Sequence, residues 1–237
     1  MQLSIPQLPI EQRGTGYTND NLMYHNFYQS PRYGSLNLKH ENYNERHIFM
    51  NSLLQEIYTK HSLLLSDNKQ ISSDSFADYH FPILFQIETL VYWMRKNMDE
   101  IIGLNYYASF YKRKGREPAK LIISSVGTLI NSPNSDVYAV FKDHIFIMER
   151  LNDISNTYKH SFLTSEAHSL FGKEEPVVNC LDLTNNHGDK GPIFHSYFLR
   201  EIVDNYWNFF MTSRDALKGF HWNAQQSPLN NEDHNPS

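Results

Sequence analysis

A single run of apolar residues constrains the fold of this chain more than any other feature. After Pro82, a residue that suits the first turn of a helix, apolar side chains recur at steps of four, three, four, four and three residues. They are Ile83, Ile87, Leu90, Met94, Met98 and Ile101. This spacing places all of them on one face of an α-helix, and such a face needs a core or a partner helix to cover it. We therefore predict a buried helix over residues 83–102, with a break at Gly103.

Most of the chain on either side of this helix also has helical periodicity. Apolar residues at helical spacing predict further helices over residues 45–65, 119–130, 137–162 and 195–217. Residues 177–183 are different, because this short apolar run after Pro176 is typical of a strand. We predict a mainly α fold, a bundle of four to five helices with a short β excursion before the last helix.

The two ends of the chain differ from its middle. Residues 1–40 contain several Pro and Gly together with aromatic residues, and we predict an irregular N-terminal arm that packs on the core. Residues 223–237 are polar and lack periodicity, which predicts a flexible tail. In a chain of 237 residues, this leaves residues 41–222 as a single helical domain.

The composition excludes several classes of protein. The formal net charge of −5 provides no overall field that attracts nucleic acid or anionic membranes. No run of about 18 apolar residues predicts a membrane span, and no secretory signal opens the chain, so we expect a cytoplasmic protein. The single cysteine, Cys180, excludes an intrachain disulfide and favours a packed thiol. The His residues lack the spacing of metal ligands, so we predict no metal and no cofactor.

The helix predicted over residues 137–162 carries the side chains best suited to chemistry. Its apolar residues form one face, and Asp153, Asn156 and His160 lie on roughly the opposite face. Such a face is often only solvated or hydrogen-bonded to a loop, although Asn and His are poorer helix formers than Glu, Lys, Gln or Arg. The alternative is that this face is a functional site. In that interpretation His160 transfers protons near neutral pH, Asn156 holds a phosphate or a ribose hydroxyl, and Asp153 orients the same ligand.

A basic segment follows the aromatic residues at positions 106–111. Its cations include Lys112, Arg113, Lys114 and Arg116. Cations beside aromatic side chains are typical of loops that bind nucleic-acid phosphates and stack on bases. The alternative is a solvated loop between two helices, which the acidic composition of the whole chain favours.

The order of these elements resembles that of uncharacterised bacterial proteins related to the HEPN superfamily. The resemblance covers roughly residues 45–210, and its motif is Asp153, Asn156 and Lys159-His160, similar to the pattern (D)xxNxxKH. It implies an α-helical, commonly dimeric protein, and many members of the superfamily are metal-independent ribonucleases. Their catalytic motif is an Arg followed, after four to six residues, by a His, often with a polar residue after the Arg.

Only part of that motif carries over to this chain. Asn156 matches the polar residue and His160 matches the His, but Asp153, Ile154 and Ser155 occupy the positions open to the Arg. Without that cation, the charge of a pentavalent phosphate lacks a stabilising partner. The resemblance thus favours a homodimeric, HEPN-like protein that binds RNA, a nucleotide or a protein partner without catalysis. The alternative is a metal-independent ribonuclease in which His160 is the general acid and base and Arg150 or Lys159 replaces the missing Arg.

Overall fold

The computed structural model describes residues 4–10, 29–66, 73–160, 174–182, 191 and 193–218, and the predicted tail at residues 223–237 lies outside them. Its helices are α1 (Leu36–Ser66), α2 (Ser73–Lys114), α3 (Val126–Ile130), α4 (Asp136–Phe141), the 3-10 helix η1 (Lys142–His144), α5 (Ile145–His160) and α6 (Leu199–Lys218). Its strands are β1 (Gln29–Ser30), β2 (Gly34–Ser35), β3 (Val177–Asp182) and β4 (Ile193–Phe198). The predicted mainly α fold, with a β segment before the last helix, is confirmed.

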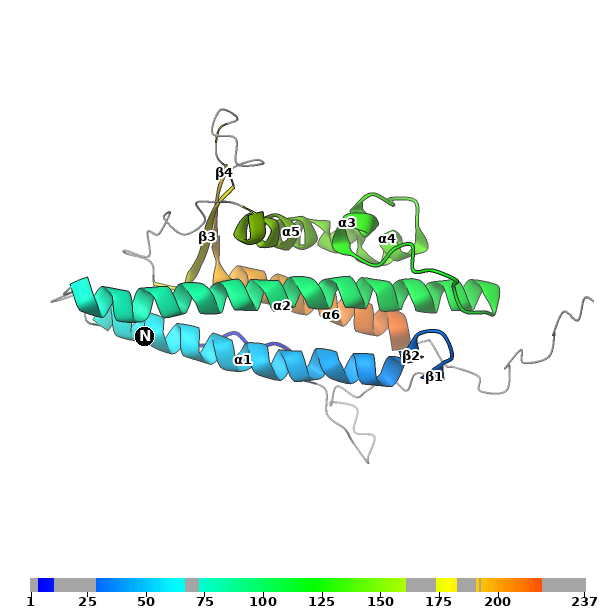
Figure 1. Cartoon of the computed structure of the whole chain (residues 1–237), viewed down its shortest axis with the longest axis horizontal. Helices are drawn as coiled ribbons and strands as arrows, with labels where there is room; N and C mark the ends of the chain where they lie inside the picture. Colours follow the sequence, from blue (N-terminus) through cyan, green and yellow to red (C-terminus); the bar gives the residue numbers. More distant parts are fainter. Residues whose placement is uncertain are drawn as a thin grey trace, which may run out of the picture.

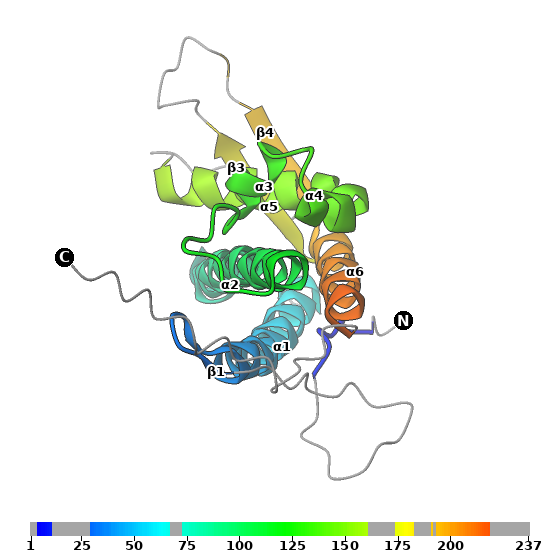
Figure 2. The ribbon, with the colours of Figure 1, turned by 90° about the vertical axis from the view of Figure 1, so that its right-hand side faces the viewer.

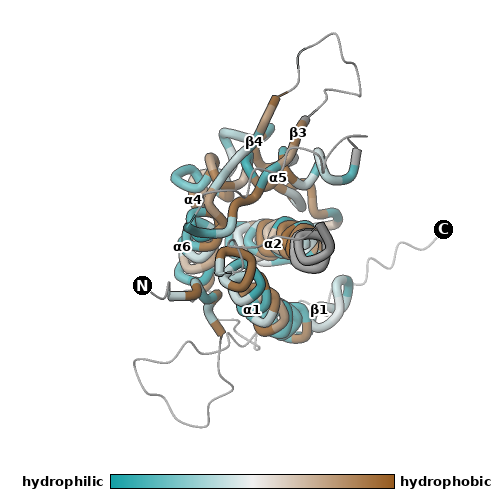
Figure 3. The backbone as a smooth tube through the Cα atoms, turned by 90° about the vertical axis from the view of Figure 1, so that its left-hand side faces the viewer, coloured by the Kyte–Doolittle hydropathy of each residue, from teal (hydrophilic) through white to brown (hydrophobic). Residues whose placement is uncertain are grey.

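Helix α2 is the centre of the molecule. It packs against α1, α5 and α6, and Figures 1 and 2 show it between α1 on one side and the layer of α3, α4 and α5 on the other. The six apolar residues of the predicted stripe are all buried, and Leu90, Met94 and Met98 have no exposed surface. Along the helices of the bundle, hydrophobic and hydrophilic stretches alternate, as expected where only one face of a helix meets the core (Figure 3). No described helix is both long and apolar enough to cross a membrane.

The length of α2 corrects two predicted boundaries. The helix already includes Pro82, and it passes through Gly103, where we predicted a break. Gly103 is buried against the segment that contains Leu121 and Ser124, so tertiary packing holds the helix where local propensity does not. The helix ends instead before Gly115, whose φ of +65° and whose N–H bond to the Tyr111 carbonyl oxygen are typical of a glycine after a helix.

Helix α1 begins at Leu36, inside the segment predicted to be irregular. Part of that segment nevertheless packs on the core without forming a helix or a strand. Leu8 is 2% exposed, and its backbone N–H and carbonyl groups both bond to the side chain of Asn51 on α1. Leu8 is therefore held on α1, while a two-stranded hairpin, β1–β2, precedes the helix.

Two other predicted helices are shorter than expected. Only Val126–Ile130 of the helix predicted over residues 119–130 is helical, and it begins at a capping box in which Ser125 and Thr128 bond to each other's backbone N–H groups. The helix predicted over residues 137–162 is divided into α4, η1 and α5. These short elements form the layer that covers α2 (Figure 2).

The β segment is a complete antiparallel hairpin. The predicted strand is β3, and its partner β4 includes His195, where we predicted the start of the last helix. A strand partner supplies backbone hydrogen bonds that no local pattern reveals, which explains this error. Val178 and Cys180 of β3 are fully buried, and α5 packs on this strand through a bond from the Tyr158 hydroxyl to the Asn179 carbonyl oxygen. The prediction of Cys180 as a packed thiol is confirmed.

Candidate functional site

The polar residues predicted on α5 lie where the periodicity places them. Ile147, Leu151 and Ile154 are buried, whereas Asp153 and Asn156 are exposed on the other side of the helix. His160 is the last residue of α5, and its side chain lies outside the part that the structure describes. Asp153 and Asn156 thus share a solvent-exposed face, and neither of them lines the pocket that the fold forms between α1 and α2.

Arg150 is one of the two cations considered as substitutes for the missing Arg. Its side chain packs against neighbouring elements of the fold. Its guanidinium lies 3.6 Å from the ring centroid of Phe146 and 4.0 Å from that of Tyr197, and it forms an ion pair with Glu201. Only 13% of its side chain is exposed. These contacts join α5 to β4 and α6, so the cation is engaged in holding three elements together.

The other candidate cation and the polar residue Asn152 also have structural partners. The Lys159 ammonium lies 5.7 Å from the ring centroid of Tyr92 on α2. Asn152 accepts a hydrogen bond of 3.0 Å from Arg95, which also pairs with Asp99. In turn, Asp99 accepts a bond of 2.7 Å from the backbone N–H of Val126, at the start of α3. This network fixes α3 and α5 on α2, so the partner of Asn152 lies on a helix and not on the neighbouring loop that the sequence suggested as one alternative.

The predicted basic segment lies at the end of α2 and in the turn after it. Lys112, Arg113, Lys114 and Arg116 are all exposed. Arg113 pairs with Asp136 at 2.7 Å, while the other three have no ion pair within the described chain. Of the aromatic residues before this segment, Tyr107 is buried and the others are partly buried, so these rings belong largely to the fold. The cations of the last turn also suit the negative end of the helix dipole.

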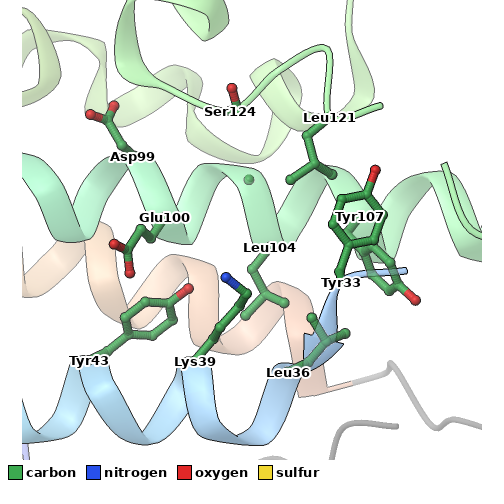
Figure 4. Close-up of a pocket in the computed structure, with 11 residues that line it drawn as sticks. Tyr33, Leu36, Lys39, Tyr43, Asp99, Glu100, Leu104, Tyr107, Leu121 and Ser124 are labelled. Atoms are coloured by element: carbon green, nitrogen blue, oxygen red, sulfur yellow. The ribbon is translucent and has the colours of Figure 1, made fainter. Parts of the chain in front are cut away.

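A pocket that the sequence did not predict lies between α1, α2 and the segment after α2. Its volume is about 170 Å³. We call it the α1–α2 pocket, and Figure 4 shows the residues that line it. They are Tyr33, Leu36, Lys39, Tyr43, Asp99, Glu100, Gly103, Leu104, Tyr107, Leu121 and Ser124. One part of this lining is apolar and aromatic, and another part is charged.

The aromatic wall of the pocket is held in place by hydrogen bonds. Tyr33 and Tyr107 meet edge to face, with their ring centroids 5.6 Å apart. The Tyr33 hydroxyl donates to the Pro118 carbonyl oxygen at 2.9 Å, and the Tyr107 hydroxyl donates to a Glu117 carboxylate oxygen at 3.0 Å. Both rings thereby attach the segment after α2 to the rest of the pocket, so the wall is formed before any ligand enters.

The charged part of the pocket combines two carboxylates with two donors. Asp99 has the partners described above, and Glu100 pairs with Arg46 at 2.8 Å and with Lys96 at 3.4 Å. The donors are Lys39, which is exposed, and Tyr43, which is 2% exposed. Burial, together with the charge of Glu100, raises the pKa of Tyr43 above its usual value, so the phenol keeps its proton and is available as a donor.

Gly103 forms part of the pocket from the middle of α2. A Cβ atom there would lie 3.8 Å from Leu121 Cδ1 and 3.8 Å from Ser124 Cα, which are ordinary contacts. The fold therefore accepts alanine at this position. Alanine would also be more favourable in a helix, where glycine costs about 1 kcal/mol relative to alanine. What the absent methyl group leaves is space in the pocket.

Sequence reasoning missed this pocket because its residues come from three separate segments. The one local signal was the pair Lys39 and Tyr43, which are four residues apart and share a helix face, but they precede the first helix that we predicted. Within the described residues, no group of three or more His, Cys, Asp or Glu side chains is arranged to hold a metal ion. Comparisons of the chain with models of protein families, with curated proteins and with solved structures found no match.

Proposed function

We propose that this protein acts by binding, without catalysis, and that the α1–α2 pocket takes a small molecule that carries a ring. The observation behind this proposal is Gly103, a buried helical glycine that the packing does not require and that enlarges the pocket. The volume of about 170 Å³ is close to the roughly 150 Å³ of an apolar cavity that binds benzene. A single ring therefore matches the pocket in size.

The engagement of both candidate cations supports binding over catalysis. Arg150 is enclosed by two aromatic rings and paired with Glu201, and Lys159 lies over Tyr92. Moving either cation to a phosphate would break contacts that join α5 to its neighbours. A HEPN-like ribonuclease remains the alternative, and the homodimer implied by the resemblance remains a prediction.

The proposal is tested by titrating the protein with phenol and benzamide, two neutral rings, and following its amide resonances by NMR. A ligand of seven to nine heavy atoms is expected to bind with a Kd of about 0.1–10 mM. The Gly103→Ala variant places a methyl group in the pocket and should weaken binding at least about fivefold, because overfilled sites lose affinity through strain.

Gly127→Ala is the matched control, because Gly127 is also helical and does not line the pocket. Nothing lies within 4 Å of the position that its added methyl group would occupy. Both variants should unfold at the same temperature as the original protein or at a higher one. Absence of binding by both rings at about 20 mM, above the weakest affinity expected of such ligands, contradicts the proposal. Equal binding by the Gly103→Ala variant contradicts it as well.

RNA binding by the basic segment is a second candidate, favoured by the three exposed cations without ion pairs in the described chain. It concerns a different surface from the pocket, so the two candidates can be tested separately.

A further inference from the structure

We infer that the ligand of the α1–α2 pocket is a ring-bearing monoanion, a monocyclic carboxylate whose charged group is held by Lys39 and Tyr43. This inference rests on the proposed function, since it names the chemical class of the molecule that the same pocket takes. It follows from the balance of donors and acceptors around the pocket.

Lys39 and Tyr43 form a pair of donors on one face of α1. They are four residues apart, and Figure 4 shows both side chains extending from α1 toward α2, with their polar ends in the same part of the pocket. An ammonium group and a protonated phenol both donate hydrogen bonds. A carboxylate has two acceptor oxygens, so it can accept from both groups at once.

Neither donor has an acceptor in the described part of the chain. Lys39 forms no ion pair there, and the Tyr43 hydroxyl forms no hydrogen bond there. Tyr43 is 2% exposed, so little of its surface reaches open solvent. Its hydroxyl oxygen is nevertheless not one of the fully enclosed polar atoms, so it opens to the pocket, where a ligand oxygen can accept from it.

The two carboxylates of the pocket already have partners of their own, although the charge of Glu100 still acts on Tyr43. Asp99 is bound by Arg95 and by a backbone N–H, and Glu100 is bound by Arg46 and Lys96. A cationic ligand would have to compete with these partners, whereas an anionic ligand meets a cation that has no ion pair in the described chain. The electrostatic balance of the pocket therefore favours an anion.

The remaining residues of the lining provide the surface that would contact the ring of the ligand. Leu36, Leu104 and Leu121 provide apolar surface, and the wall of Tyr33 and Tyr107 provides aromatic surface (Figure 4). Lys39 is exposed, which places the carboxylate toward solvent and the ring toward the apolar lining. This arrangement, an apolar pocket with a few polar groups that fix orientation, is typical of small-molecule sites.

The test compares benzoate, benzamide and benzylamine, which share one ring and differ in charge, by titration calorimetry and NMR. We expect benzoate to bind at least about tenfold more tightly than benzamide, because hydrogen bonds to a charged group are stronger than those to a neutral one. Benzylamine is expected to bind most weakly. Inorganic phosphate, an anion without a ring, should bind more weakly than benzoate.

Two variants test whether Tyr43 and Lys39 hold the carboxylate of the ligand. Tyr43→Phe should weaken benzoate binding about tenfold to a hundredfold, because it removes a buried donor to a charged group. Lys39→Met keeps the aliphatic stem and should weaken benzoate binding about twofold to fivefold, because this cation is exposed. Neither variant should change benzamide binding by as large a factor.

Matched controls exist for both variants. Tyr58 is also buried on α1 with a hydroxyl that lacks a partner in the described chain, and Lys142 is also exposed, but neither lines the pocket. Tyr58→Phe and Lys142→Met should therefore leave benzoate binding unchanged.

The outcomes separate this inference from the proposed function. Equal binding of the three rings, or tightest binding of benzylamine or phosphate, overturns the monoanion inference. Equal loss of benzoate affinity in the Tyr58→Phe control also overturns the assignment of Tyr43. Absence of binding by all three rings overturns the proposed function itself, together with the inference that rests on it.

Discussion

Replacing Arg150 with Met tests whether this cation holds the fold together or serves chemistry. Met retains an aliphatic chain of similar length, so the packing of the arginine stem between Phe146 and Tyr197 is largely kept. What the substitution removes is the charge over both rings and the ion pair with Glu201. We expect the variant to fold and to be less stable than the original protein.

The expected loss of stability can be estimated from these contacts. Because 44% of the Glu201 side chain is exposed, its ion pair contributes about 0.2–1 kcal/mol. Each cation–π contact adds about 0.5–1 kcal/mol. The buried Arg150 Nε has no hydrogen-bond partner in the described chain, and its removal offsets part of the loss. The sum is about 1–2 kcal/mol, which lowers the unfolding midpoint by about 2–8 °C for a chain of this size.

Urea and thermal unfolding, followed by circular dichroism, measure this change. A double-mutant cycle with Glu201→Gln isolates the ion pair, and a coupling free energy of about 0.2–1 kcal/mol is expected. The same proteins, together with His160→Ala and Asn156→Ala, are assayed for metal-free cleavage of total RNA. We expect no cleavage by any of them.

Two results would refute this reasoning. If Arg150→Met unfolds like the original protein, the contacts with Phe146, Tyr197 and Glu201 contribute nothing to stability. If the original protein also cleaves RNA, and both Arg150→Met and His160→Ala abolish the cleavage, Arg150 is the missing cation. The ribonuclease alternative would then replace our proposal. In that case His160→Ala should lower the cleavage rate about 10²–10⁴-fold, because it removes general acid–base catalysis.

Three further predictions concern the core, the pH dependence of stability and the basic segment. Leu90→Ala should lower the free energy of unfolding by about 2–5 kcal/mol, since Leu90 is fully buried on α2, and unchanged urea unfolding would contradict its place in the core. Burial lowers the pKa of His144 below its usual value of about 6.5, so the unfolded chain takes up the proton first and stability falls as the pH decreases below 6.5. Urea unfolding at about pH 7.5 and about pH 5.0, on either side of that value, should show a smaller decrease for His144→Gln, and an equal decrease would assign the pH dependence to other groups. If the basic segment binds RNA, affinity should decrease steeply with salt and disappear when acidic residues replace all four cations, whereas unchanged binding would exclude this surface. These cations are Lys112, Arg113, Lys114 and Arg116.

The sequence by itself determined the elements whose signal is local. The stripe from Ile83 to Ile101 predicted the buried face of the central helix, and all six of its residues are in the core. The spacing on α5 likewise separated its buried residues from the exposed Asp153 and Asn156. Both predictions succeeded because the period of a helix is set by its own backbone, so residues three and four apart reveal the face they share.

Only the tertiary structure decided where helices continue, where strands pair and where a ligand fits. Gly103 was predicted as a break, but α2 continues through it because the segment with Leu121 and Ser124 packs against the helix there. His195 was predicted as helical, yet it pairs with Cys180 in the β3–β4 hairpin.

The α1–α2 pocket depends even more on tertiary structure. Its lining comes from Tyr33 to Tyr43, from Asp99 to Tyr107 and from Leu121 to Ser124, three stretches that are separate in the chain. Backbone pairing and cavities depend on contacts between segments that no local pattern encodes. The donors Lys39 and Tyr43 could be recognised as a pair only after α1 was known to include them and α2 was known to lie opposite.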